Sequence, residues 1–94
     1  MKTFNDLIFK AHSLEKFSEE NKHAILFFPN GFGVSVLLGS SFFSNGIDTY
    51  ELAILKGDKN NYELSYDTPI TKGVLAHLSK DEVTEVMIRT QQLS

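Results

Sequence analysis

Alternating apolar and polar residues predict a run of short strands through the middle of the chain. The pattern indicates strands over residues 23–28 and 34–38, joined by a turn at residues 29–31, and a third strand over residues 49–55. The Asn-Gly pair in the turn is a strong hairpin signal, because both residue types tolerate the positive φ that a type I′ turn requires. We therefore expect an antiparallel hairpin closed by a type I′ turn.

A fourth strand is expected over residues 62–67, after a polar turn at residues 57–61. Side chains alternate cleanly along this strand, so one set faces the core and the other faces solvent. We predict that Tyr50, Leu52 and Ile54 share one face of the third strand. In the fourth strand we predict Tyr62, Leu64 and Tyr66 inward, with Glu63, Ser65 and Asp67 outward.

The pattern changes at Pro69, which cannot donate to a strand ladder and is expected to end the sheet. Thr71 is placed to cap a short helix that carries Val74, Leu75 and Leu78.

Ser79 and Glu82 form a capping box that opens the last helix, and acidic residues in its first turn suit the helix dipole. An apolar stripe follows at helical spacing: Val83, Val86, Met87 and Thr90, extended by Leu93. The predicted fold is a single α+β domain over residues 1–94. It has an antiparallel meander sheet of four to five strands, with C-terminal helices packed on one face.

The N-terminal segment allows two interpretations. Apolar residues recur at helical spacing over residues 3–20, with Thr3 and Asp6 placed as a capping box. Residues 6–12 also alternate, as a strand would, with Leu7, Phe9 and Ala11 on one side.

Composition excludes several classes of function. The 94 residues include no cysteine, so disulfides and cysteine-ligated metals are absent. The net charge of −3 comes with no basic stripe, so we expect no direct nucleic-acid binding. The first ten residues lack the pattern of a signal peptide. No catalytic or metal signature stands out, and we expect neither a cofactor nor a metal.

One long stretch is free of charge. Residues 24–47 contain no Asp, Glu, Lys or Arg, and glycines and Pro29 interrupt them too often for a membrane-spanning helix. Such a hairpin is either covered on both faces by the chain itself or has one face committed to a partner. A homodimer joined through sheets or strand edges is one way to cover it.

Each candidate site has a structural alternative. Gly31-x-Gly33 precedes a strand and not a helix, so we interpret it as a turn and not as a phosphate loop. His12, His23 and His77 are each alone in their segment, although His12 and His77 would form a rudimentary catalytic site with Asp67 if the fold joined them.

Two loops are candidates for binding. Phe42 and Phe43 lie among polar residues, so at least one of them is an anchor for a partner unless the loop covers the sheet edge. Asp67 either forms an Asx-type turn at the strand end or lines a pocket together with Tyr66 and Thr68.

Four motifs, FPNGFGVSV, TYELAIL, YDTPIT and LSKDEV, resemble a family of short proteins from tailed bacteriophages and prophages. The likeness covers residues 23–93, with Phe32 where tyrosine is common and Lys72-Gly73 where an acidic pair often follows. Related chains open with an extended segment that matches residues 5–12, and this implies a first strand over residues 6–12 followed by a loop.

The resemblance implies an accessory protein made in the cytoplasm of the infected host cell, which acts by binding and counteracts host defence. The expected target is a host protein, bound through the charge-free hairpin and the Phe42-Phe43 loop, or a small signalling nucleotide. The alternatives are a small enzyme near His12, His77 and Asp67, and a virion assembly protein. The candidate binding residues are Phe42, Phe43, Asn45, Tyr50, Tyr66, Asp67 and Thr68.

Overall fold

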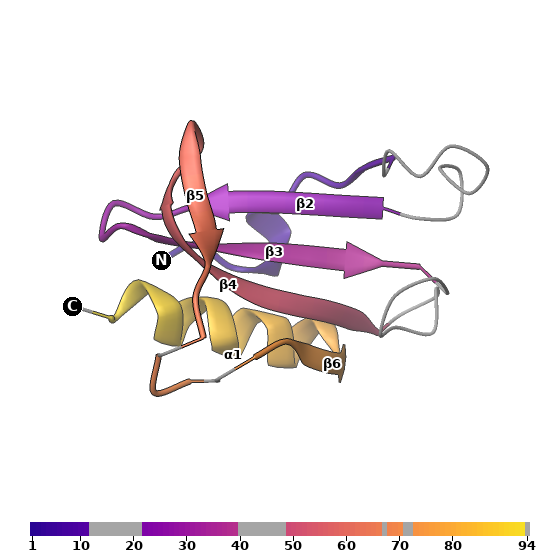
Figure 1. Cartoon of the computed structure of the whole chain (residues 1–94). Coiled ribbons are helices and arrows are strands. Elements are labelled where there is room, and N and C mark those ends of the chain that lie inside the picture. Colours follow the sequence, from indigo (N-terminus) through magenta and orange to yellow (C-terminus); the bar gives the residue numbers. More distant parts are fainter. Residues whose placement is uncertain (12–21, 40–48, 67, 71–72, 94) are drawn as a thin grey trace.

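The computed structural model describes residues 1–11, 22–39, 49–66, 68–70 and 73–93. An antiparallel sheet is covered on one face by a C-terminal helix, which confirms the predicted α+β class (Figure 1). The elements are η1 (Phe4–Asp6), β1 (Lys10–Ala11), β2 (Lys22–Phe27), β3 (Phe32–Leu38), β4 (Tyr50–Asp58), β5 (Asn61–Leu64), β6 (Leu75–Leu78) and α1 (Lys80–Gln91).

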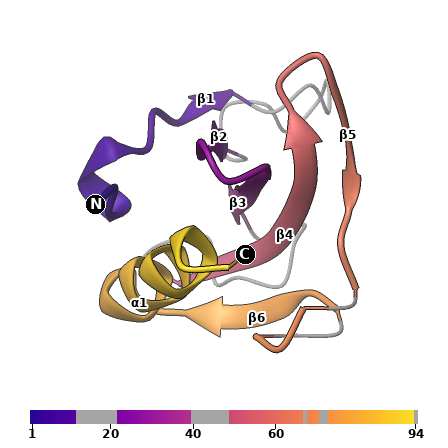
Figure 2. The ribbon, with the colours of Figure 1, turned by 90° about the vertical axis from the view of Figure 1, so that its left-hand side faces the viewer.

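The sheet is organised around β4, its longest strand. The strand order is β1-β2-β3-β4-β5, and β6 also pairs with β4. β3 occupies one edge of β4, whereas β5 pairs with the C-terminal part of the other edge and β6 with its N-terminal part. Figure 2 shows β4 curving between β6 at one end and β5 at the other.

The core lies between the sheet and α1. Side chains that alternate along β3 and β4 are buried against the apolar stripe of the helix, where Val83 and Met87 are fully enclosed. Tyr50, Leu52 and Ile54 share one face, as predicted, and this face is the buried one. Most of the helical stripe that the spacing predicts is also confirmed. Removal of this apolar surface from water is the main force that holds the helix on the sheet.

The N-terminus of α1 is closed by the predicted capping box. The Glu82 backbone N–H donates to Ser79 Oγ at 3.2 Å, and the Ser79 backbone N–H donates to Glu82 Oε1 at 2.9 Å. Two backbone donors that helix geometry leaves without partners are thereby satisfied.

The β2–β3 turn differs from the expected type I′ turn. The backbone N–H of Phe28 donates to the Phe32 carbonyl at 2.7 Å, so three residues form the loop. The Gly31 N–H donates to the Phe28 carbonyl at 3.3 Å, and Gly31 has a φ of +85°, whereas Asn30 does not have a positive φ. This geometry fits a type I turn with Pro29 at its first central position and a left-handed glycine after it.

The side chain of Asn30 binds the end of α1, a contact that the Asn-Gly turn signal does not predict. Its side-chain Nδ2 donates to the carbonyls of Thr90 at 2.9 Å and Leu93 at 3.0 Å, while its Oδ1 accepts from the Phe32 N–H at 3.2 Å. Carbonyls at a helix C-terminus have no partner within the helix. The Asn30 amide therefore ties the β2–β3 turn to the end of α1.

The second glycine of the motif makes room for an aromatic ring. Gly33 is the cross-strand partner of Phe27, and a Cβ at Gly33 would lie 2.6 Å from Phe27 Cδ1. The Phe27 ring also packs against Tyr62, with 5.2 Å between the ring centroids. Gly31-x-Gly33 is thus a turn followed by a close contact within the sheet, which confirms the structural interpretation.

The predicted orientation of the fourth strand is wrong. Tyr62 and Leu64 are each 45% exposed and Tyr66 is 54% exposed, whereas Ser65 is only 5% exposed. Residues opposite one another on paired strands share a face, and Leu64 lies opposite Leu55, on the face turned away from α1. Glu63 is exposed as predicted, but Ser65 is buried and the apolar side of the strand faces away from the core.

The predicted short helix after Pro69 is also wrong. Leu75–Leu78 form strand β6, so the sheet continues past the proline and a single α-helix covers it. The N-terminal part of the β4 edge extends beyond β5 and needs hydrogen-bond partners, and the returning chain supplies them. Thr71, the expected cap, lies outside the described residues.

The N-terminal segment follows neither prediction fully. A 3₁₀ turn at Phe4–Asp6 is followed by an extended segment, so a helix over residues 3–20 is excluded, and the strand expected over residues 6–12 is present only at Lys10–Ala11. The Thr3 N–H donates to Asp6 Oδ2 at 2.8 Å, as expected for a cap.

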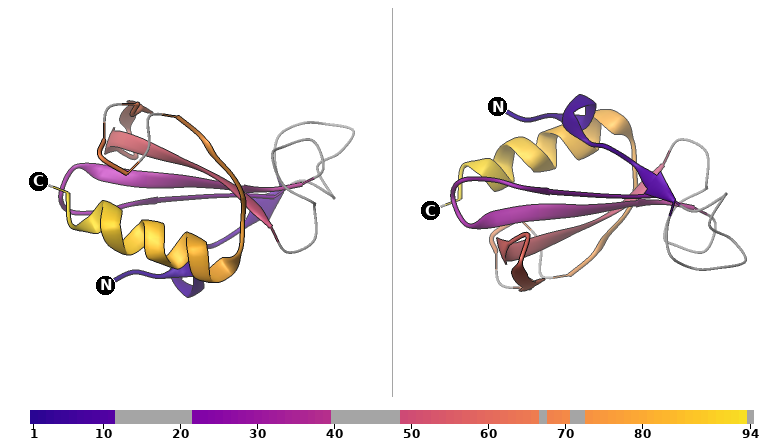
Figure 3. Two further views of the ribbon diagram at one scale, coloured as in Figure 1. Left: turned by 90° about the horizontal axis from the view of Figure 1, so that it is seen from below. Right: turned by 90° about the horizontal axis from the view of Figure 1, so that it is seen from above.

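The N-terminal segment lies beside α1 (Figure 3), and side chains of the helix bind it there. Gln91 exchanges two hydrogen bonds with the Lys2 backbone, at 2.9 and 2.8 Å, and the Phe4 N–H donates to Thr84 Oγ1 at 3.1 Å. Phe4 then reaches the core beside Tyr50, with 5.1 Å between the ring centroids.

We predict that Asn30→Ala lowers the free energy of unfolding by about 1–2 kcal/mol, because carbonyls at the end of α1 lose their donor. Asn30→Asp keeps the acceptor for the Phe32 N–H but places a carboxylate beside those carbonyls, so it is expected to destabilise at least as much. Urea unfolding measures both effects. Midpoints equal to that of the wild type would contradict the role of Asn30.

Candidate functional site

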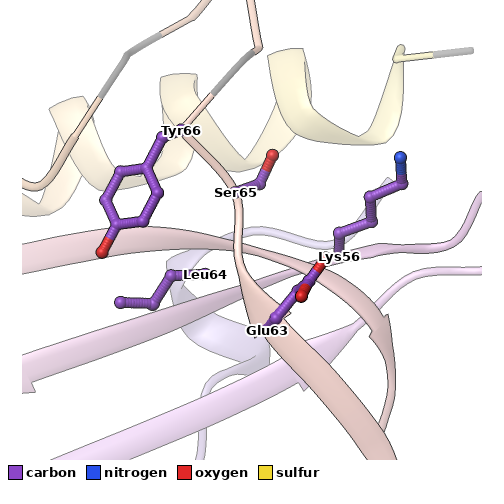
Figure 4. Close-up of a pocket in the computed structure, with 5 residues that line it drawn as sticks. All are labelled: Lys56, Glu63, Leu64, Ser65 and Tyr66. Atoms are coloured by element: carbon purple, nitrogen blue, oxygen red, sulfur yellow. The ribbon is translucent and has the colours of Figure 1, made fainter.

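The candidate site is the strand β5 and the surface on either side of it. An open hollow of about 490 Å³ is lined by Lys56, Glu63, Leu64, Ser65 and Tyr66 (Figure 4). A second hollow of about 260 Å³ is lined by Lys56, Asn61, Tyr62 and Glu63. Both hollows therefore follow the β4–β5 hairpin.

The backbone of β5 is hydrogen-bonded along one edge. The Ser65 N–H donates to the Ile54 carbonyl at 2.8 Å, so Ser65 points its backbone groups towards β4. Backbone direction alternates along an antiparallel strand, so Glu63 also faces β4, whereas Tyr62 and Leu64 direct their N–H and C=O groups to the other edge. Among the described strands, β4 is the only one that pairs with β5. The outer edge of β5 is therefore open.

Side chains beside this open edge are large and exposed. Leu64 and Tyr66 project to the same side of the chain, with Ser65 on the opposite side (Figure 4). Tyr62 stands two residues before Leu64 and so shares its face. We call Tyr62, Leu64 and Tyr66 the β5 row.

The β5 row continues onto the sheet face turned away from α1, which we call the outer face. Phe27 contacts Tyr62 there, and Ile25, two residues before Phe27, is 38% exposed. Residues 24–38 contribute no charged side chain to this face. The outer face is therefore without charge along β2 and β3, although it includes Ser35 and, on β4, Glu51 opposite Leu37.

The polar groups of the hollows offer little for catalysis. Lys56 and Glu63 lie opposite one another on paired strands and supply one cation and one carboxylate. No group of three or more His, Cys, Asp or Glu side chains able to hold a metal occurs within the described part of the chain.

The predicted binding residues are only partly assembled. Tyr66 lines the larger hollow, but Tyr50 is 4% exposed and enclosed by the rings of Phe4 and Phe9, and Thr68 is buried. Tyr50 thus belongs to the core and presents no ring to a ligand. Phe42, Phe43, Asn45 and Asp67 lie outside the described residues.

Of the three residues expected to form an enzymatic site, only His77 lies within the described part of the chain. His12 and Asp67 lie outside the described residues, and His77 is exposed on β6. His23 lies on β2, with its Nε2 2.8 Å from Ser35 Oγ on the neighbouring strand. This contact is structural, as expected for a lone histidine.

Strain at His77 has a local cause. Its φ of 54° is left-handed, and the β4–β6 register shifts at this point: Tyr50 pairs with Leu78 and Leu52 with Leu75. Two steps along β4 therefore face three steps along β6, which is a β-bulge with one extra residue. Such bulges often place a left-handed residue, most often glycine, at this position.

Comparison with family models, curated proteins and solved structures gives no match for this chain. No helix in the described ranges has the length and apolar character needed to span a bilayer. The site must therefore be interpreted from its own geometry.

The sequence patterns did not indicate that Lys56, Glu63 and Leu64 lie together at one surface site. The available signal was the composition of the fourth strand, which follows a polar turn and carries polar residues on one side. That composition fits an edge strand with either side exposed, and we assigned the apolar side to the core.

We predict that His77→Gly is more stable than His77→Ala by about 1 kcal/mol, because only glycine adopts left-handed φ without a Cβ clash. At a helical or extended position, the alanine variant would be the more stable of the two. Thermal and urea unfolding of the two variants give the comparison. An alanine variant as stable as the glycine variant would contradict the bulge.

Proposed function

We propose that this chain acts by binding a host protein, as an accessory protein of a tailed bacteriophage that counteracts host defence in the cytoplasm of the infected cell. The observation that supports binding is the exposure of Ile25, Tyr62 and Leu64 on the outer face. The phage setting rests on the motif resemblance alone.

The chemistry of the outer face indicates the kind of partner. Interface cores are depleted in charged residues and enriched in aromatic ones. The β2–β3 part of the outer face has this character, since Phe27 forms an aromatic contact with Tyr62 and residues 24–38 carry no charge. A partner protein that presents an apolar patch therefore fits it.

A small nucleotide fits the described surface less well. Phosphate binding needs cations or free backbone donors, and the larger hollow offers Lys56 beside the carboxylate of Glu63. The N-terminus of α1 is occupied by its own capping box and carries Asp81 and Glu82, which repel an anion. Tyr50, one of the residues expected to bind the nucleotide, is buried.

We predict that Ile25→Glu abolishes capture of a host protein by the tagged chain, because a carboxylate would have to be desolvated in the interface. The matched control is Val74→Glu, since Val74 is 41% exposed and precedes β6, which pairs with the N-terminal part of β4, whereas Ile25 lies on β2. Capture from host lysate, followed by mass spectrometry, compares both variants with the wild type.

Equal capture by both variants would exclude the outer face as the binding site. Circular dichroism melts confirm that each variant is folded. A thermal shift of the wild type with mono- or cyclic nucleotides would favour the nucleotide target instead, because ligand binding stabilises the native state.

A further inference from the structure

We propose that the open edge of β5 pairs with β5 of a second copy of this chain, in an antiparallel two-fold arrangement with Leu64 opposite Leu64 of the partner subunit. This self-association does not depend on the host target. It joins the two sheets edge to edge and leaves the β2 side of each outer face accessible.

The first argument is that the outer edge of β5 is exposed and unprotected. Tyr62 and Leu64 direct their backbone donors and acceptors away from β4, and all four residues of β5 are exposed. Edge strands are normally protected by proline, by lysine or by a covering element. Residues 61–66 contain neither proline nor lysine, and Glu63 is their only charge.

The second argument is register. Hydrogen-bonded pairs across the new junction must join residues whose backbone groups point outward, which are Tyr62, Leu64 and, by the same alternation, Tyr66. An axis at Leu64 pairs Leu64 with its copy and Tyr62 with Tyr66 of the partner subunit. All outward-pointing residues then have partners.

The other two-fold registers are worse. An axis at Glu63 places two carboxylates directly opposite one another, which is unfavourable on paired strands. An axis at Tyr62 sets Leu64 opposite Asn60, which belongs to the β4–β5 turn and so ends the ladder. Of these three registers, the Leu64 register makes the segment complementary to itself.

The third argument is the side-chain face. Because Tyr62, Leu64 and Tyr66 share one side of the chain, the Leu64 register gathers both copies of the β5 row into a single apolar strip. Tyr62 and Leu64, each 45% exposed in one copy, would be covered in part by the same residues of the other. A two-fold junction requires this kind of self-complementary surface.

The absence of native cysteine allows a direct test by single-cysteine variants. Leu64→Cys is expected to form a disulfide-linked dimer under mild oxidation, because paired Cα atoms lie about 5.5 Å apart, within disulfide range. Tyr62→Cys is not expected to cross-link to itself, since the two positions would be offset by about 14 Å along the strands.

A mixture of Tyr62→Cys and Tyr66→Cys chains is expected to give the mixed dimer, which tests the register. Glu63→Cys and Val74→Cys serve as controls that are not expected to cross-link. Equal cross-linking of all variants would indicate random collision and overturn the proposal. Preferential cross-linking of Glu63→Cys would overturn the Leu64 register.

Sedimentation of the wild type at tens of micromolar is expected to show a dimer, and Leu64→Lys a folded monomer. A wild-type monomer under these conditions would overturn the proposal. If no dimer forms but capture of the host protein still depends on Ile25, the dimer proposal is overturned while the proposed function stands.

Discussion

Pairing along β4 is the constraint on which the rest of the structure depends. β3, β5 and β6 all form their ladders with this strand, and Tyr50, Leu52, Ala53, Ile54 and Leu55 are buried along it. Because β5 and β6 divide one edge between them, β5 pairs only with the end of β4 and has its other edge open. The exposed edge of β5 is thus a consequence of the way in which β3, β5 and β6 pair with β4.

A second constraint positions the helix on this sheet. The capping box closes the start of α1, and the Asn30 amide binds carbonyls at its end, so both termini are anchored by side chains. Gln91 and Thr84 then hold the N-terminal segment against the helix, which brings Phe4 beside Tyr50. One face of the sheet is therefore filled by α1 and the N-terminal segment, whereas Ile25, Tyr62 and Leu64 are exposed on the outer face.

Local patterns in the sequence predicted the central strands and the last helix, because burial of one face imposes a regular period. They failed where tertiary contacts decide. Leu75 and Leu78 have a spacing that a helix accepts, yet the free part of the β4 edge makes them a strand. The alternation in β5 predicts that the strand has two different faces, but it does not indicate which face is buried. Of the residues that line the candidate site, only Tyr66 was predicted as a binding residue. Lys56 and Glu63 are brought together by the pairing of β4 with β5, which the sequence pattern does not reveal.

The central claim is that β5 pairs with β4 through Glu63 and Ser65 and with a second copy through Tyr62 and Leu64. Amide hydrogen exchange, followed by NMR over a range of protein concentrations, tests it most directly. We predict slow exchange at Glu63 and Ser65 at every concentration, and exchange at Tyr62 and Leu64 that slows as concentration rises. Exchange at Tyr62 and Leu64 that is fast at all concentrations would contradict the claim.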